Sequence, residues 1–260
     1  MYGKPIPWNK KVISTSLPID ETDDIRPGLG QSGVANLKRF VSDGGLLVTA
    51  QDTAKFAIDV GLAPGVSVTP THDLKVVGSI LKTYTVDSTS PVAYGYGSSL
   101  SIYSADGESF NVSDQVGGDY GLTSVNDYQR VTGRGGPDED DSPEGRPFQA
   151  PPALPSPKPW EPIPLNEDQA RNNYFLIPQA DRPRVILRFG DAGELLVSGL
   201  LQSGQEMADH AAVVDAVYGK GHVLLFAGNP IYRAYTIGTY PLVFNAVMNY
   251  DHLDTGRSDK

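Results

Sequence analysis

The sequence predicts an α/β fold, and three consecutive segments are the basis of that prediction. Residues 32–43 and 53–60 carry apolar side chains at the spacing of amphipathic helices, and residues 46–50 between them read LLVTA. A continuous apolar run of this length is typical of a strand buried on both faces, which is common in parallel sheets. Helix, strand and helix in this order indicate a layered α/β domain.

The first helix has recognisable start and stop residues. Ser32 is a candidate N-cap, because its hydroxyl can accept a hydrogen bond from the first turn. Gly44 stands where a left-handed residue ends a helix. The residues expected to face the core are Val34, Leu37, Phe40 and Val41. Four prolines interrupt the 31 residues before the helix, which we expect to be irregular apart from a short strand at 12–19.

The remaining ordered segments are predicted to be mainly β-structure. Short β-like runs lie at 76–86, 92–94, 100–103, 184–189 and 195–201. Residues 211–217 and 222–227 flank the sequence Tyr-Gly-Lys-Gly, which predicts a β-hairpin. A final helix is expected at 239–250, with Thr239 as its cap and Pro241 in its first turn, where a missing N–H costs nothing.

A segment rich in proline, glycine and charge interrupts the domain at 133–172. Such a composition cannot bury enough apolar surface to offset the entropy of ordering it, so we expect a disordered, mobile insertion with polyproline character. The sequence therefore predicts one α/β domain formed by residues 1–132 and 173–254, with this insertion between them.

Composition argues against several classes of function. The net charge is −10 and no stripe of Lys and Arg is visible, which disfavours nucleic-acid binding. No apolar run approaches 20 residues, so no membrane span is expected. The absence of cysteine removes thiol nucleophiles and thiolate zinc ligands, and none of the four histidines has a second ligand at helical spacing. We therefore predict neither a metal site nor a cofactor.

Residues 28–33 read GLGQSG and match the dinucleotide-binding pattern G-x-G-x-x-G. Asp52 follows at about the distance of the acidic residue that binds a ribose in such sites, roughly 20 positions on. A dinucleotide site, however, needs a buried strand that runs directly into the first glycine. Here the preceding residues are ETDDIRP, whose carboxylates would repel a pyrophosphate. Nucleotide binding is thus the weaker alternative to a glycine-rich entry into a helix.

Three polar residues follow predicted strands and are candidates for ligand binding. Asp52 comes directly after the strand at 46–50, and Asn229 and Arg233 come after the hairpin. Open α/β sheets bind ligands beyond the carboxyl ends of their strands, and an arginine can hold a carboxylate in bidentate geometry. The competing interpretations are that Asp52 caps the next helix and that Arg233 pairs with an acidic residue of its own chain.

Four segments, taken in order, resemble a known family. They are DETDDIRPGLGQSGVANLKRFVSDGGLLVTAQDTAKFAID, PVAYGY, LLVSGLL and YGKGHVLLFAGNPIYRAYTIGTYPLVFNAVMN. They resemble the C-terminal class I glutamine amidotransferase-like domain of bacterial zinc carboxypeptidases of the carboxypeptidase A type. The resemblance implies a flavodoxin-like layered sheet whose first parallel strand is missing, so that the chain is truncated at its N-terminus and a sheet edge is exposed.

The resemblance also implies that both activities of the family are absent. The amidotransferase nucleophile is a cysteine after the strand at 46–50, where this chain has Gln51 and Asp52, and acyl transfer needs a thiolate. The peptidase motif His-x-x-Glu has no counterpart. We therefore expect a non-catalytic accessory domain with a structural or binding role.

Its expected partner is a metallopeptidase domain or protein, and a peptide substrate is a further candidate. The resemblance implies export to the periplasm or medium, although residues 1–5 begin no apolar signal region. The alternative is an enzyme or ligand-binding domain of unrecognised chemistry that uses Asp52 with Arg233 or Asn229.

Overall fold

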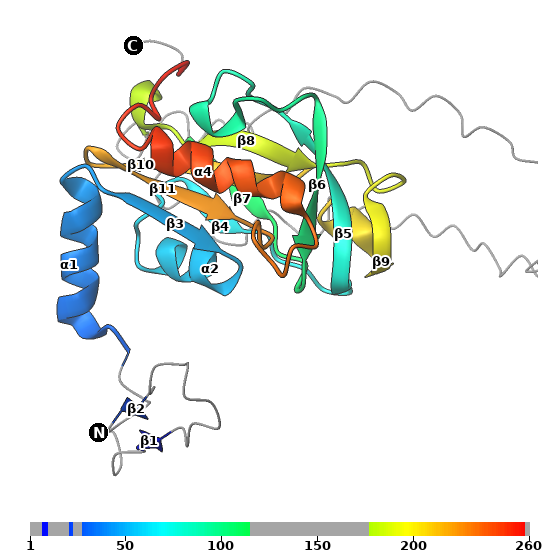
Figure 1. Ribbon diagram of the computed structural model, residues 1–260, viewed down its shortest axis with the longest axis horizontal. Coiled ribbons are helices and arrows are strands. Elements are labelled where there is room, and N and C mark those ends of the chain that lie inside the picture. Colours follow the sequence, from blue (N-terminus) through cyan, green and yellow to red (C-terminus); the bar gives the residue numbers. More distant parts are fainter. Residues whose placement is uncertain (1–6, 10–20, 23–27, 115–176, 258–260) are drawn as a thin grey trace, which may run out of the picture.

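The computed structural model describes residues 7–9, 21–22, 28–114 and 177–257. They form an α/β fold in which one curled nine-stranded sheet carries few helices (Figure 1). Its main path is β3 (Leu46–Ala50), β11 (Gly221–Phe226), β10 (Ala211–Tyr218), β8 (Arg184–Phe189), β5 (Lys75–Thr85) and β6 (Ser99–Ser104). Beside this path, β4 (Val66–Val68) pairs with β7 (Phe110–Val112), β7 also pairs with β10, and β9 (Leu196–Gln202) pairs with β5.

The helices are short and few. They are α1 (Gly30–Ser42), α2 (Asp52–Asp59) and α4 (Tyr240–Met248), with 3-10 turns η1 (Pro91–Ala93), η3 (Gln179–Asp181), η4 (Gly204–Glu206) and η5 (Ile237–Thr239). A separate two-residue pair joins β1 (Trp8–Asn9) to β2 (Glu21–Thr22). None of the helices in the described ranges is long and apolar enough to cross a membrane.

The sheet is mostly antiparallel, whereas the sequence predicts parallel strands. Only β3 and β11 pair in parallel among the described strands, with Leu46 opposite His222 and Ala50 opposite Phe226. Neighbours such as β10 and β11 are joined by a tight turn, which is possible only between antiparallel strands. The two strands that do run in parallel end at the same edge of the sheet.

The strand β3 lies at the end of the main path, and the prediction that it is buried on both faces is wrong. Among the described strands it pairs with β11 alone, and Thr49 is its one fully buried residue. An end strand has one neighbour, so its apolar residues stay half-buried. The apolar run was a sound indicator of a strand but carried no information about its place in the sheet.

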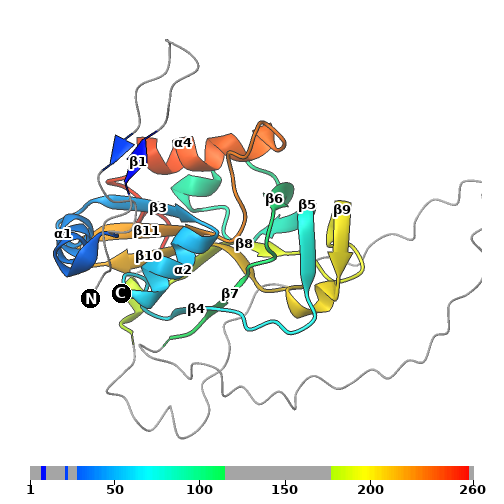
Figure 2. The same ribbon diagram turned by 90° about the horizontal axis from the view of Figure 1, so that it is seen from below.

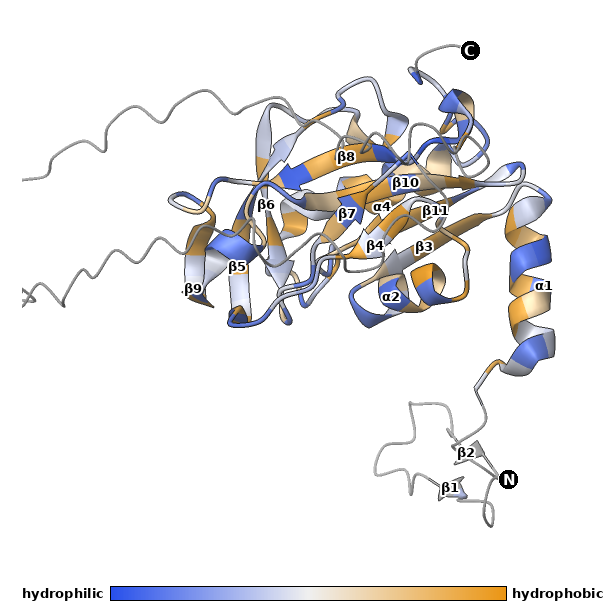
Figure 3. Ribbon diagram, turned by 180° about the vertical axis from the view of Figure 1, so that it is seen from behind, coloured by the Kyte–Doolittle hydropathy of each residue, from blue (hydrophilic) through white to orange (hydrophobic). Residues whose placement is uncertain are grey.

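The central strands form the core, and a helix covers each face. In Figure 2, α4 lies on one side of β3, β11 and β10, and α2 lies on the other. Figure 3 shows the strands around β10 and β11 as the most hydrophobic part of the molecule. The fully buried core residues include Ile186, Leu187, Val213, Val214, Leu224, Leu225 and, from α4, Leu242 and Ala246. The sheet is thus held between α2 and α4.

One predicted helix cap and one predicted strand differ from the structure. The helix α1 begins at Gly30, so Ser32 lies inside its first turn and the N-cap residue is Leu29, which makes no side-chain cap bond. The predicted end is confirmed, because α1 stops before Gly44, which adopts φ +117. Residues 92–94, expected as a strand, belong instead to the 3-10 turn η1, because Pro91 supplies no N–H to a ladder.

The predicted hairpin of β10 and β11 is confirmed, and its turn contacts the end of α1. Gly219 adopts φ +67 in the turn, and Lys220 N–H donates to Ser42 O at 3.0 Å. A Cβ on Gly221 would lie 2.1 Å from Val41 O. Only glycine therefore allows the hairpin to lie this close to the end of α1.

A buried ionic network, which sequence reasoning missed, fixes the C-terminal segment to the sheet. The Asp215 side chain is completely buried on β10 and accepts hydrogen bonds from His222 Nδ1 at 2.8 Å and Arg257 Nη2 at 2.7 Å. Burial alone would raise the pKa of Asp215, but His222 and Arg257 outweigh it and hold that pKa below its usual value. A single Asp inside the strand AAVVDAVY gives no sign of these partners.

The predicted insertion at 133–172 lies outside the described residues, as does the expected strand at 12–19. The described residues on either side of 115–176 meet, because Ile177 N–H donates to Asp114 O at 2.7 Å. Strands from before and after that gap share the one sheet, where β11, β10 and β8 lie between β3 and β5.

Candidate functional site

The turn between β3 and α2 places Gln51 at the carboxyl edge of the parallel pair. Gln51 has φ 52 and ψ −131, a conformation that costs a residue other than glycine about 1–3 kcal/mol. Its N–H donates to Phe226 O at 2.9 Å, so the turn continues the ladder to β11. A sharp, strained turn from strand to helix is the geometry that projects a nucleophile from the edge of a sheet in hydrolases, and here it projects an amide.

Asp52 is the first residue of α2, and the prediction that it caps this helix is wrong. The N-cap residue is Gln51, and no side chain makes a cap bond there. Thr53 Oγ1 holds the turn instead, because it accepts from Ala50 N–H at 2.8 Å and donates to Ala50 O at 2.6 Å. Asp52 is left exposed, with its carboxylate at the positive end of the helix.

Two further acidic residues, which the sequence analysis did not single out, lie beside this turn. Gln51 Nε2 donates to Asp106 Oδ2 at 3.1 Å. The Oε2 atom of Glu108 is buried and has no hydrogen-bond partner among the described residues. Burial, reinforced by the negative charges of Asp52 and Asp106, raises the pKa of Glu108 to about 7. We call Gln51, Asp52, Asp106 and Glu108 the acidic edge.

Three aromatic rings border the acidic edge, and we call Tyr103, Tyr232 and Tyr235 the tyrosine cluster. The rings of Tyr103 and Tyr232 are stacked, with centroids 4.2 Å apart and planes 3° apart. Tyr235 lies 5.7 Å from Tyr103 and 5.8 Å from Tyr232, with tilted rings. The pKa of Tyr103 is raised by burial first, then by Tyr232, and also by the charge of Asp106. The cluster and the acidic edge both include residues at the end of β6, because Tyr103 lies in that strand and Asp106 follows it.

Asn229 and Arg233 lie on the side of the tyrosine cluster. Asn229 N–H donates to Tyr103 O at 2.9 Å, and its side-chain Oδ1 accepts from Ile231 N–H at 3.1 Å. Arg233 adopts φ +43 and lies over the Tyr232 ring, 5.3 Å from its centroid. The expected pairing of Arg233 with an acidic residue of its own chain is not found, because no described carboxylate contacts it.

The three residues predicted from the sequence are thus divided between the two parts of this surface. Within the described ranges, no hydrogen bond or ion pair joins Asp52 to Arg233 or Asn229. The residues that the sequence analysis missed had a local signal. Asp106 and Glu108 directly follow the strand β6, and Tyr232 and Tyr235 flank Arg233 in the sequence YRAY.

Gly228 brings the segment after β11 into close contact with β6, and Gly228→Ala is expected to separate them. The new Cβ would lie 2.3 Å from Tyr103 O, so the chain after β11 must move away from β6. We expect the free energy of unfolding to fall by about 1–3 kcal/mol. The free energy of unfolding is measured by urea titration, with circular dichroism as the signal.

Gly238→Ala is the matched control, because nothing lies within 4 Å of a Cβ there. That variant should be unchanged or slightly more stable. Equal losses in the two variants would contradict the close contact at Gly228.

Glu108 should make the protein less stable as the pH rises. Its folded pKa of about 7 lies above the ordinary value of 4.5 for a glutamate, so between these values the unfolded chain has released the proton while the folded chain still holds it. We expect Glu108→Gln to remove this decline between pH 5 and 8. At pH 8 the variant should be more stable by on the order of 1 kcal/mol, a figure reduced because the side chain is only half-buried.

Thermal unfolding of both proteins across this pH range is the measurement. Parallel curves for wild type and Glu108→Gln, with no divergence above pH 5, would show that Glu108 keeps an ordinary pKa.

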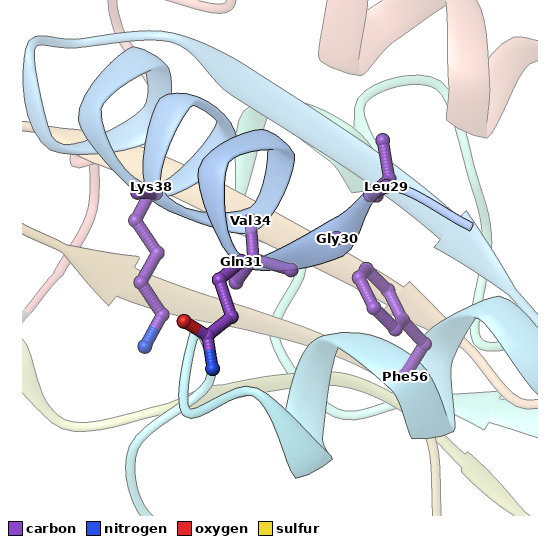
Figure 4. Close-up of a pocket in the computed structure, with 7 residues that line it drawn as sticks. Leu29, Gly30, Gln31, Val34, Lys38 and Phe56 are labelled. Carbon is purple, nitrogen blue, oxygen red and sulfur yellow. The ribbon is translucent and has the colours of Figure 1, made fainter. Parts of the chain in front are cut away.

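A second candidate location is the groove between α1 and α2, which includes part of the GLGQSG motif (Figure 4). Its volume is about 560 Å³, within the range of small-molecule sites. The lining residues are Leu29, Gly30, Gln31, Val34, Ala35, Lys38 and Phe56. Because α1 begins at Gly30, the second and third glycines of the motif lie in the helix rather than in a turn before it. The residues that lead into Gly28 lie outside the described ranges.

No group of three or more His, Cys, Asp or Glu side chains in the described part of the chain could hold a metal ion. The acidic edge is therefore a cluster without metal-ligand geometry.

No family model matches the sequence, and no curated protein matches it. Cytoplasmic protein STM3548 from Salmonella typhimurium is 8% identical over 84% of this chain and 60% of that chain, with a TM-score of 0.39. A cold-adapted β-galactosidase from Rahnella sp. R3 is 9% identical over 84% of this chain and 20% of that chain, with a TM-score of 0.40. Cytoplasmic protein STM1381 from Salmonella typhimurium LT2 is 8% identical over 87% and 59%, with a TM-score of 0.35. The chain spans less than two thirds of each of these proteins.

Proposed function

We propose that this chain is a non-catalytic binding domain of the class I glutamine amidotransferase-like type, associated with a zinc carboxypeptidase-type protein. The observation that carries the proposal is Gln51. It occupies a strained turn with φ 52 at the carboxyl edge of β3, the position at which the resembled family has its cysteine. An amide cannot form the acyl intermediate that a thiolate forms, and the chain has no cysteine elsewhere.

The finer fold assignment belongs to the same proposal. A flavodoxin-like sheet is supported by the order β3, α2 and by the parallel pairing of β3 with β11.

The surface for binding consists of the acidic edge and the tyrosine cluster. Asp52, Asp106 and Glu108 bring three carboxyl groups together, and the nearby Lys55 is engaged by Asp59 at 2.7 Å. Aromatic faces beside carboxylates suit a ligand that carries both an apolar part and a positive charge. We infer that the domain binds a peptide through a lysine or arginine side chain at this edge.

Two assays of the purified chain test the absence of catalysis. We expect no release of ammonia from glutamine, and no release of C-terminal residues from peptides in the presence of Zn²⁺. Turnover in either assay would overturn the proposal. The association with a peptidase is tested by reading the DNA upstream of the codon for Met1 and in the neighbouring genes, where a metallopeptidase with His-x-x-Glu is expected.

Calorimetric titration tests the binding surface. A tripeptide with a central lysine or arginine should bind, whereas one with a central glutamate should not. Asp106→Asn should weaken the binding, because it removes one carboxylate and alters the hydrogen bond of Gln51. Equal affinity for both kinds of peptide would place binding elsewhere.

An enzyme at the same edge is the second candidate, and one observation favours it. A carboxyl group whose pKa is raised to about 7, as that of Glu108 is, suits general acid–base catalysis near neutral pH. If an activity is found, Glu108→Gln should abolish it while leaving the fold intact. An activity that survives in this variant would exclude Glu108 as the acid–base group. NAD or FAD binding in the groove of Figure 4 is the candidate with the least support. Calorimetry that detects no heat of binding at millimolar NAD or FAD would exclude it.

A further inference from the structure

The outer face of α4 is apolar and exposed. Leu242 and Ala246 point into the core, whereas Phe244 is 61%, Val247 55% and Met248 80% exposed. These three positions are spaced i, i+3 and i+4, so they lie on one face of the helix. A helix that is apolar on all sides is normally buried. In Figure 1 no other labelled helix or strand lies over the side of α4 that faces away from the sheet.

Neighbouring residues extend this face into a larger surface, which we call the α4 patch. Its exposed apolar side chains are Tyr94, Ile237, Phe244, Val247, Met248 and Tyr250. Tyr94 belongs to the patch because its backbone O accepts a hydrogen bond from Asn245 Nδ2 on α4 at 2.9 Å. Since a whole aromatic side chain contributes about 150–250 Å², the six together expose on the order of 600 Å². That reaches the upper end of the largest patch on an ordinary monomer, about 300–600 Å².

The charge of the chain limits what can cover the α4 patch. No charged residue occurs from Ala234 to Tyr250, although the whole chain has a net charge of −10. Two copies of so acidic a protein repel each other, and a contact surface without charged residues adds the least to that repulsion. The polar side chains of α4 are also engaged internally, because Asn245 Nδ2 donates to Val92 O at 3.1 Å and Asn249 Nδ2 donates to Asn245 O at 2.8 Å. The outward surface therefore offers neither charge nor free amides to select a different protein.

We propose that the α4 patch is the interface with a second copy of this chain. The two α4 helices would pack against each other across a twofold axis, so that each copy presents the same apolar face to the other. Homodimer interfaces are more apolar than interfaces between different proteins, which agrees with an uncharged patch. A standard interface buries about 800 Å² on each partner, and the patch supplies most of that area. This proposal does not depend on the proposed function.

Sedimentation velocity of the full chain over a range of concentrations tests the proposal. We expect a species of twice the 27.9 kDa chain mass at high concentration. Met248→Glu places a charge at the most exposed position of the patch and should raise the dimer dissociation constant at least about tenfold. Phe244→Glu is the second variant, and far-ultraviolet circular dichroism confirms that both remain folded.

Leu200→Glu is the matched control. Leu200 is a 68% exposed apolar residue on β9, in a different apolar surface, so this variant should dimerise like the wild type. A wild-type chain that stays monomeric at all concentrations would overturn the proposal, because the patch would then belong to another partner. The proposal would also be overturned if Met248→Glu and Phe244→Glu still formed dimers while Leu200→Glu was monomeric.

Discussion

Arg257→Met is expected to lower the free energy of unfolding by about 3–5 kcal/mol, because it leaves a buried carboxylate without its cation. Asp215 is fully buried, and Arg257 Nη2 lies 2.7 Å from its Oδ2. Arg257 Nη1 also donates to Arg182 O at 2.7 Å, so the substitution removes a second link between the C-terminal segment and the rest of the domain. Denaturant unfolding at pH 7 measures the loss.

Arg233→Met is the matched control for this prediction. Arg233 is exposed and has no ion pair with a described residue, so its replacement should change the stability by less than about 0.5 kcal/mol. A loss at Arg257 as small as that at Arg233 would show that the network at Asp215 contributes little.

The same network predicts a difference in acid sensitivity between Asp215→Asn and the wild type. The folded pKa of Asp215 is depressed, so its contribution is fully present above the unfolded pKa of about 3.9 and is lost as the pH falls through the folded pKa. The wild type should therefore be more stable than Asp215→Asn at pH 6, and the gap should narrow below about pH 4. Urea titrations at these pH values measure it. A gap that stays constant or widens in acid would contradict the depressed pKa.

Local patterns in the sequence were sufficient for several elements. The hairpin of β10 and β11 follows from Tyr-Gly-Lys-Gly between two apolar runs, and the structure pairs Tyr218 with Gly221 across that turn. The start of α4 at Tyr240 and the position of Pro241 in its first turn are confirmed in the same way. Turn and helix signals extend over a few residues, so a single sequence contains them in full.

Features that depend on contacts distant in the sequence could not be predicted. The strand β3 is separated from β11 by about 170 positions, and only this pairing makes Gln51 and Phe226 neighbours. The acidic edge combines the turn at Gln51 with Asp106, and Asp215 needs Arg257 from the C-terminal segment. The position of Asp52 after a strand indicates the edge at which Gln51 lies, but it does not indicate the residues that contact Gln51.

Tyr103→Ala is the second variant with a large expected effect, a loss of about 3–5 kcal/mol. Tyr103 is only 7% exposed, and its ring is the base on which Tyr232 stacks at 4.2 Å. Removing it creates a cavity beneath the segment that carries Asn229 and Arg233, so the aromatic half of the proposed binding surface should lose its fixed position. Denaturant unfolding measures the stability, and near-ultraviolet circular dichroism reports the loss of the ordered rings.

Two further variants separate the ring stack from the hydroxyl and from simple exposure. Tyr103→Phe keeps the stacked ring, so it should retain most of the stability and the near-ultraviolet signal. Tyr235→Ala removes the outer member of the cluster, which is 66% exposed, and should cost much less than Tyr103→Ala. If Tyr103→Phe were as destabilising as Tyr103→Ala, the hydroxyl rather than the stack would hold the segment after β11. The peptide-binding surface would then depend on a hydrogen bond, and its affinity should fall in Tyr103→Phe as well.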